Sequence, residues 1–387
     1  MGRSAFAAVH RIANLALFAA LPALLTIVVL TGAFARGPFL YDFHGGLYQG
    51  AKDVVHGTNP YRASYLEDQA DRKRAGKPFE TVIDVPVYPA PALVAAVPFS
   101  LLPYRVAGVI FSTLSMAGLL VGLRLLEVTD WRCYGVAFLS WPVIHGLMLG
   151  ALTPLLVLAA ALAWRYRGST RAAAAVAGAV VAKLFLWPLG VWLLATRRVR
   201  ALVLAVVVGT VVTVAAWAAI GFAGLADYPR MLGDLSFVSE DVGVSAVAAL
   251  VALGFSATLA KAAAVAVGAA ISLIAWRVAG GRNGDRRAFG LAVVAALVAS
   301  PIVWPHYLAL VFVPIALAAP RLSPLWFAPL LLDVFPVGQT TGRPWLIPVY
   351  LVVLALPALA LARPDVSGFP ARPDARAARL RPHQTAP

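Results

Sequence analysis

Three stretches of the sequence carry the residues best suited to chemistry, and each lies within or beside an apolar segment. They are "YDFHGGLYQGAKDVVHGTNPY" with Asp42, "AVVAKLFLWP" with Lys183 and "SPIVWPHY" with His306. A carboxylate can take a proton from a hydroxyl, whereas an ammonium and an imidazole N–H can bind a phosphate. The three residues therefore indicate proton transfer on a substrate that carries phosphate.

Asp42 lies about eight residues beyond the first apolar run, at the expected membrane boundary. A carboxylate in that position can meet a lipid-borne substrate, and partial desolvation raises its basicity. The alternative is a structural role, in which Asp42 caps a helix or pairs with Arg36 or Arg62.

Lys183 lies midway along an apolar segment, where an ionisable side chain is costly and therefore suggests function. The alternatives are a snorkelling lysine or an internal ion pair. His306 has its own alternative, an aromatic anchor at the membrane interface with a hydrogen-bonded histidine. His145, in "WPVIHGLMLG", is interpreted as a packed core histidine.

Sugars are commonly held by aromatic faces, carboxylates and amides. Candidate contacts to an acceptor or a sugar are Tyr41, Tyr48, Tyr61, Tyr88, Trp304, Tyr307 and Arg343. Gln339 and the charged loop 221–244, with Asp227, Tyr228, Arg230, Asp234, Glu240 and Asp241, add weaker candidates. A solvated external loop is the alternative for these last residues.

The composition identifies the surroundings of these residues as a membrane. Of 387 residues, 61% are hydrophobic and 13% are charged, whereas a soluble domain is about half apolar and about one quarter charged. The first apolar run, 12–34, exceeds a signal-peptide core and is long enough to be a retained span. The chain is thus expected to be an all-α polytopic membrane protein.

The net charge of +15 comes largely from arginines in short loops and in the tail. The positive-inside rule explains such clusters better than nucleic-acid binding does, and it places them and both termini in the cytoplasm. Span one then carries the chain out, so the loop 36–88, with its interfacial helices, is external. The run Arg72–Lys77 counts against this scheme, although long loops follow the rule less strictly.

We expect about 10–12 spans, forming a single transmembrane domain over residues 1–362, followed by a basic, disordered tail over 363–387. The segment 172–195 lies between two arginine clusters, so it must enter the membrane and return. At 1.5 Å per residue each arm reaches only about 18 Å, short of a ~30 Å core. This predicts a hairpin of half-helices with Lys183 near its tip. The segment 133–164 is too long for one straight span and short for two.

Several site types are absent from the sequence. The single Cys133 allows neither an intramolecular disulfide nor a CxxC metal site. There is no Walker A motif and no glycine-rich dinucleotide fingerprint. We therefore expect no metal, cofactor or nucleic-acid partner, and chemistry that uses a lipid phosphate on the outer face.

With these pieces in order, the chain resembles glycosyltransferase family 87, the polyprenyl-phosphate-mannose-dependent mannosyltransferases. The resemblance rests on the Asp42 stretch ending in "GTNPY", on "VYPAPALVAAVPFSLLP", on "AKLFLWPLGVWLLATRRVRA" and on "SPIVWPHY". The chain departs from the family pattern at "LGALTPLL" and at "VGVSA". The resemblance spreads over most of the chain and implies the membrane fold of class C glycosyltransferases.

The resemblance also implies roles for individual residues. Asp42 would be the catalytic base for inverting, α-forming transfer of a mannosyl or other pentosyl or hexosyl residue from a polyprenyl-phosphate sugar. Lys183 and His306 would bind the donor phosphate. The acceptors implied are glycolipids and lipoglycans of actinobacterial envelopes, on the outer face of the cytoplasmic membrane, and we expect a monomer.

Two other classes of function compete with this interpretation. A transporter or flippase of a lipid-linked sugar should place charges near the bilayer midplane and repeat its broken helices in two halves. A non-catalytic envelope-assembly partner would use its polar loops only as a docking surface. The long first loop and the polar groups at the membrane boundary favour an enzyme.

Overall fold

A computed structural model describes residues 2–35, 39–61, 64–77, 86–334 and 346–363, and every regular element among them is a helix. This confirms the predicted all-α polytopic class. Four helices of the described chain are long and apolar enough to cross a membrane, or six if each of two bent pairs is one span. The remaining predicted spans correspond to apolar helices of 10–17 residues.

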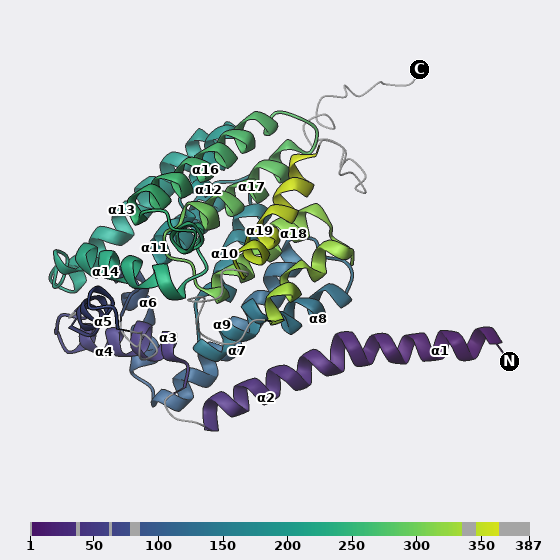
Figure 1. Ribbon diagram of the computed structural model, residues 1–387, viewed down its shortest axis with the longest axis horizontal. Coiled ribbons are helices and arrows are strands. Elements are labelled where there is room, and N and C mark those ends of the chain that lie inside the picture. The colour runs from purple at the N-terminus through teal and green to yellow at the C-terminus, as the bar shows by residue number, and fades with distance from the viewer. Residues whose placement is uncertain (1, 36–38, 62–63, 78–85, 335–345, 364–387) are drawn as a thin grey trace, which may run out of the picture.

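The four long spans include the N-terminal helix, which runs through α1 (Gly2–Leu15), the π-helical turn η1 (Ala16–Ala20) and α2 (Leu21–Ala35). In Figure 1 this helix runs along one side of the bundle and its N-terminal part projects beyond it. The other three are α7 (Tyr104–Leu125), α13 (Val199–Ala219) and α16 (Ala257–Val278). Their surfaces are rich in exposed valine and leucine, as expected for helices that face lipid.

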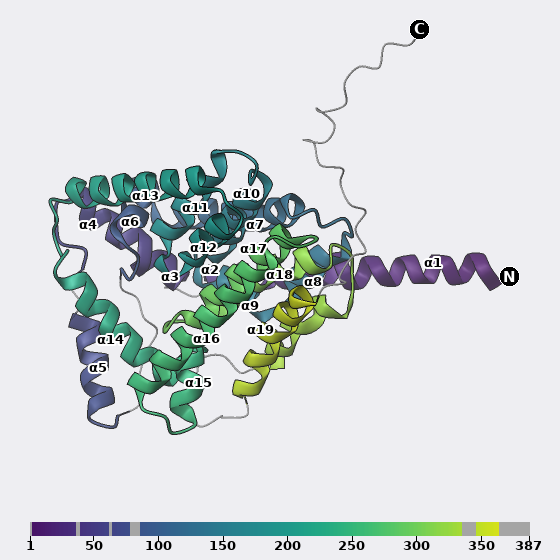
Figure 2. The ribbon, with the colours of Figure 1, turned by 90° about the horizontal axis from the view of Figure 1, so that it is seen from above.

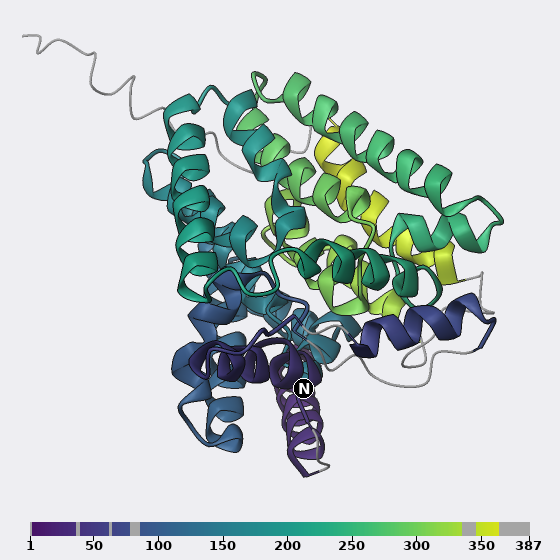
Figure 3. The same ribbon diagram turned by 90° about the vertical axis from the view of Figure 1, so that its left-hand side faces the viewer.

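Short helices at one end of the bundle form the beginning of the first loop. They are α3 (Tyr41–Phe43), the π-helical η2 (His44–Gln49), α4 (Gly50–Val55) and α5 (Ser64–Arg74), and the chain then enters α6 (Ala90–Ser100). α4 ends at its cap residue His56, and the following Gly57 takes a φ of +68°, which favours glycine. Figure 3 views the molecule from the end that carries these helices.

A broken span packs against this end. α8 (Arg132–Leu139) and α9 (Trp141–Leu149) are followed by α10 (Thr153–Arg165), and α9 and α10 bend by 115°. Gly150 makes the bend with a φ of +64°, and a Cβ at this position would lie 2.7 Å from the Cβ of Phe43. Glycine therefore allows α9 to reach the residue that follows Asp42.

The segment 172–195 forms the predicted hairpin. α11 (Arg171–Ala182) ends at Lys183, whose extended backbone (φ −149°, ψ 105°) leads into η3 (Leu184–Leu186) and α12 (Pro188–Ala195). At the other end of the hairpin, Arg167 and Arg198 both pair with Asp285, at 3.4 and 2.7 Å. The two arginine clusters therefore lie together, and Lys183 lies about 18 Å away along α11.

The loop 221–244 is not an irregular segment but contains α14 (Asp227–Val242), which packs on α5. Figure 2 shows these two helices side by side. Lys73 of α5 reaches the buried Glu240 at 3.2 Å, and Lys261 of α16 reaches the other oxygen of Glu240 at 3.1 Å. The apolar segment 245–276 is not one continuous helix, because α15 (Ala246–Ala252) ends before α16 starts behind its Ser256 cap.

The C-terminal part supplies the largely buried helix α17 (Gly284–Ala299), followed by η4 (Pro305–Val311), α18 (Phe312–Ala318), η5 (Pro324–Val334) and α19 (Leu346–Ala362). Gly268 of α16 faces Ala299 of α17 so closely that an added Cβ would lie 2.6 Å from the Cβ of Ala299. Small residues of this kind allow membrane helices to approach each other closely.

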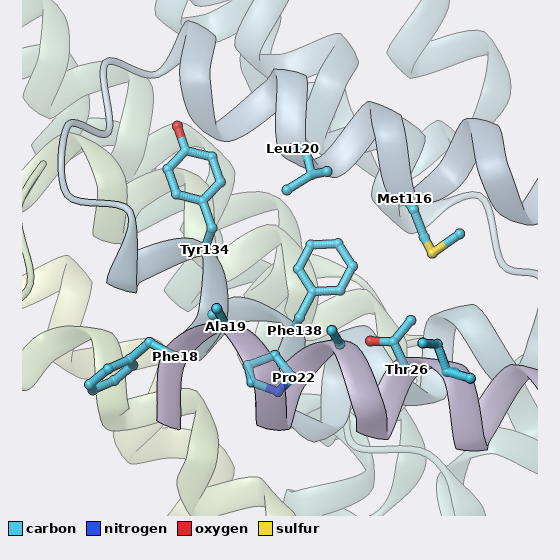
Figure 4. Close-up of a pocket in the computed structure, with 11 residues that line it drawn as sticks. Phe18, Ala19, Pro22, Thr26, Met116, Leu120, Tyr134 and Phe138 are labelled. Atoms are coloured by element: carbon cyan, nitrogen blue, oxygen red, sulfur yellow. The ribbon is translucent and has the colours of Figure 1, made fainter. Parts of the chain in front are cut away.

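An apolar cavity of about 350 Å³ lies between the N-terminal helix, α7 and α8. Figure 4 shows Pro22 and Thr26 on one wall with Leu120 and Phe138 across from them. The lining is almost entirely hydrocarbon and contains no ionisable group except the phenol of Tyr134. This cavity therefore offers no carboxylate, imidazole or ammonium group.

Candidate functional site

The backbone around Asp42 is held by an aromatic cluster. Leu40 takes a left-handed conformation with a φ of 53° and starts α3, so that Asp42 falls in the first turn. The next side chain, Phe43, is fully buried and stacks on Phe111 with ring centroids 4.5 Å apart. Asp42 thus projects from a fixed point, and 22% of its side chain stays exposed.

Two groups from distant parts of the chain face the Asp42 carboxylate. The hydroxyl of Tyr88, just before α6, donates a hydrogen bond to Oδ2 over 3.4 Å. The Nε2 atom of His306 lies 3.4 Å from the same oxygen. This second contact is within ion-pair distance but is not a hydrogen bond. Nε2 therefore has no hydrogen-bond partner among the described residues.

Lys183 enters the same site from the tip of the hairpin. Its ammonium donates a hydrogen bond to the hydroxyl of Tyr307 and lies 4.2 Å from the ring centroid of Tyr88 and 4.5 Å from that of Tyr307. The residue is 9% exposed. Aromatic faces and a hydroxyl stabilise a buried cation without neutralising it, which leaves its charge available to an anion.

His306 and Tyr307 stand at the start of η4, behind a break that the sequence encodes. Pro301 and Pro305 interrupt the helical pattern, and the carbonyl of Val303 accepts a hydrogen bond from the Val244 N–H at 2.7 Å. The break between α14 and α15 therefore supports the segment that carries His306. His306 itself is only 2% exposed.

The structure brings Asp42, Lys183 and His306 into one cluster, joined through Tyr88 and Tyr307. The cluster combines a partly exposed carboxylate, a buried ammonium and a buried imidazole. Such an arrangement can accept a proton at one point and stabilise a developing negative charge beside it. No group of three or more histidine, cysteine or acidic side chains suited to a metal ion occurs in the part of the chain that the structure describes.

The aromatic residues predicted to contact sugar fall into two sets. Tyr48 and Tyr61 are buried, and their hydroxyls donate to the carbonyls of Leu102 and Tyr88, at 2.8 and 3.1 Å. These contacts give the two rings packing roles, and sugar contact by them stays a prediction. Tyr41 and Trp304 are half-buried, while Arg343 and Gln339 lie outside the described residues.

Trp304 has a central position beside the cluster. Its ring packs against the main core of the bundle, against the aromatic core around Phe43, and against the contact between α5 and α14. It lies two residues before His306 and keeps part of its surface exposed. Trp304 is thus a partly exposed aromatic ring close to His306 in the chain, and sugar contact by it stays a prediction.

The charged candidates of the 221–244 loop are largely used in contacts with the first loop. Asp234 pairs with Arg74 and Arg230 pairs with Glu67, each at 3.4 Å. Asp227 accepts a hydrogen bond from the Asn59 amide at 3.2 Å. These pairs join two loops that were both predicted to be external, which supports their placement on one side.

His145 was interpreted as a core histidine, but it lies beside the cluster. Its ring is stacked on Trp141, with centroids 5.0 Å apart, and is 5.6 Å from the His306 ring. Sequence reasoning missed this neighbour because a lone histidine in an apolar helix more often packs than reacts. The available signal was the Pro–His–Gly order in "WPVIHGLMLG", next to the bend at Gly150.

Comparisons with known proteins agree with the resemblance seen in the motifs. A family model described as glycosyltransferase family 87 matches residues 87–305. No curated protein and no solved structure matches the chain. The matched range covers more than half of the 387 residues and includes the segments of Tyr88, Lys183 and Trp304. The chain therefore belongs to glycosyltransferase family 87 and is a glycosyltransferase of the membrane.

Proposed function

We propose that this glycosyltransferase transfers a mannosyl residue, or another hexosyl or pentosyl residue, from a polyprenyl-phosphate sugar to a glycolipid or lipoglycan acceptor. The observation that carries the proposal is the convergence of Asp42, Lys183 and His306 within one membrane-embedded cluster. A base and two phosphate-binding groups are what transfer from a lipid phosphate requires. Family membership favours this enzyme over a transporter of lipid-linked sugar.

Asp42 is the proposed base. Its carboxylate takes the proton of an acceptor hydroxyl as the hydroxyl oxygen attacks the anomeric carbon of a β-linked donor. The new C–O bond forms while the bond from the anomeric carbon to the phosphate oxygen breaks, so the product is an α-linkage. The partly exposed face of Asp42 supports this role because an acceptor can reach it.

The departing group is a polyprenyl phosphate, which gains one negative charge as the bond breaks. Lys183 and His306 are the proposed partners of that charge. As a neutral imidazole, His306 would donate one N–H hydrogen bond towards the phosphate. Preorganised donors of this kind stabilise charge that develops in a water-poor site.

The proposed location of the reaction is the outer face of the cytoplasmic membrane. The arginine clusters around Arg167, Arg198 and Arg286 gather at the end of the bundle opposite Lys183. Arg287 also donates to the carbonyls of Leu361 and Ala362, which brings the end of α19 to the basic end. By the positive-inside rule, this supports our proposal that the basic end lies in the cytoplasm, and we propose that both termini lie there too.

The test is an assay of purified protein with labelled polyprenyl-phosphate mannose, polyprenyl-phosphate arabinose and a nucleotide-linked mannose, each with a panel of glycolipid acceptors. We expect transfer from a polyprenyl-phosphate donor and none from the nucleotide sugar. Linkage analysis should find an α-linkage. Transfer from the nucleotide donor alone, or a β-linked product, would contradict the proposal.

A further inference from the structure

His145 takes no part in the function proposed above, yet its surroundings are unusual for a packing residue. Its Nδ1 atom is buried without a hydrogen-bond partner among the described residues. The same holds for both ring nitrogens of His306. Buried polar atoms are normally satisfied, and those that are not often mark a place where a ligand or water binds. Here, three such atoms lie on two neighbouring rings.

The His145 ring is held in position from two sides. Trp141, four residues earlier on α9, stacks on it at an interplanar angle of 19°, and the His306 ring lies across from it at 5.6 Å. The start of α9 is itself fixed, because the Asp333 carboxylate accepts the Trp141 N–H at 2.5 Å. Gly146, the next residue on α9, lies beside His306, since a Cβ there would make an ordinary contact 3.4 Å from the Cβ of His306.

The charges of the cluster define what these nitrogens can bind. Asp42 and Lys183 together contribute no net charge, so a phosphate that becomes more negative needs further donors. A phosphate accepts several hydrogen bonds but donates none once it is ionised, and a neutral imidazole supplies one N–H. Two adjacent imidazoles can therefore add donors without adding a second buried cation.

We propose that His145 is a second imidazole ligand of the leaving phosphate, donating from Nδ1 beside His306 and Lys183. This inference rests on the proposed function, because it assumes a polyprenyl-phosphate donor. The inference differs from the proposed function in giving a role to His145, which is not in the motifs that carry the family resemblance. The contact strengthens as the bond to the sugar breaks, so it should favour the product phosphate over the donor.

The test measures binding of the product, polyprenyl monophosphate, by two methods: inhibition of sugar transfer and the rise in melting temperature of the purified protein. The variants are His145→Asn, whose amide nitrogen can stand near Nδ1, His145→Gln, and His145→Leu, which fills similar space without a donor. His56→Ala is the matched control, because His56 is exposed and its Nδ1 already contacts the Lys52 carbonyl.

We expect His145→Leu to weaken polyprenyl monophosphate binding about tenfold or more, as loss of a hydrogen bond to a charged group does. His145→Asn should stay within about threefold of the wild type, and His145→Gln should lie between the two. The His56→Ala control should bind as the wild type does. Binding to His145→Leu at the wild-type level, or equal losses in the Asn and Leu variants, would overturn the role of His145.

A wrong donor class and a wrong role for His145 would give different results in this test. If polyprenyl monophosphate neither inhibits nor stabilises the wild type, the proposed donor is wrong and the inference falls with it. If it acts on the wild type and on His145→Leu alike, only the inference is contradicted. Should the Leu variant not fold, the comparison of Asn with Gln still decides whether a donor at Nδ1 matters.

Discussion

The Nε2 atom of His306 lies 3.4 Å from Oδ2 of Asp42, although one residue follows the first span and the other opens η4 late in the chain. The bend at Gly150 brings α9 against Phe43, and one turn earlier on the same helix Gly146 lies beside His306. The proposed base and the proposed phosphate ligand are therefore fixed relative to each other by the same helix.

Replacing Lys183 tests the phosphate-binding end of the cluster. Lys183→Met keeps the length and most of the apolar volume of the side chain but removes the charge. We expect the transfer rate to fall by about 10²–10³, the range seen when one preorganised stabilising group is removed. Steady-state kinetics with varied polyprenyl-phosphate mannose would measure this fall.

Lys77→Met is the control for this substitution, because Lys77 is exposed and follows the end of α5. It should leave the rate within about twofold, as most surface substitutions do. A rate for Lys183→Met that equals the control would remove Lys183 from the phosphate site.

Asp285 should be important for stability rather than for chemistry. It receives two hydrogen bonds from Arg198, both at 2.7 Å, and one from the Trp192 indole at 2.8 Å, and it pairs with Arg167. Asp285→Asn removes the charge that holds the two ends of the hairpin together. We expect a loss of about 1–3 kcal/mol in stability, seen as a lower melting temperature in detergent.

Asp71→Asn provides the comparison, because the Asp71–Arg74 pair is exposed and each side chain has more than half of its surface in solvent. Such pairs contribute little, so this variant should melt within a degree or two of the wild type. Equal melting temperatures for the Asp285 and Asp71 variants would show that the hairpin is held by other contacts.

The orientation in the membrane can be read by cysteine labelling. In a Cys133→Ala background, His56→Cys and Arg282→Cys place single thiols at exposed positions near the cluster and at the basic end, respectively. An impermeant thiol reagent should label position 56 in intact cells and position 282 only after permeabilisation. Labelling of both positions from the same side would contradict the proposed topology.

Much of the fold could be predicted from the sequence, because hydrophobicity and charge act locally. The hairpin with Lys183 at its tip follows from two arginine clusters separated by too few residues for two full spans. The break at "SPIVWPHY" follows from its two prolines. The pattern did not predict that α14 forms within the 221–244 loop or that the chain breaks between α15 and α16. Both depend on docking against α5 and on capping by Ser256, and hydrophobicity alone does not report such contacts.

The site was predictable only in part. Asp42, Lys183 and His306 stand out because they are ionisable groups beside apolar runs, and their meeting through Tyr88 and Tyr307 is a tertiary outcome. His145 could not be assigned, since its significance lies in the 5.6 Å separation from a histidine far along the chain. Tyr48 and Tyr61 were candidates because of their aromatic rings, and only the structure shows that these rings are buried in the fold.

The most direct test of the proposed chemistry is Asp42→Asn. Asparagine keeps the size and polarity of the side chain but cannot take a proton from the acceptor hydroxyl. Transfer from polyprenyl-phosphate mannose should be measured for wild type and variant at matched protein amounts, with polyprenyl monophosphate binding as a check on folding. We predict that transfer falls by at least about 10²–10⁴ while this binding is retained. Transfer by Asp42→Asn at the wild-type rate would show that Asp42 is not the base.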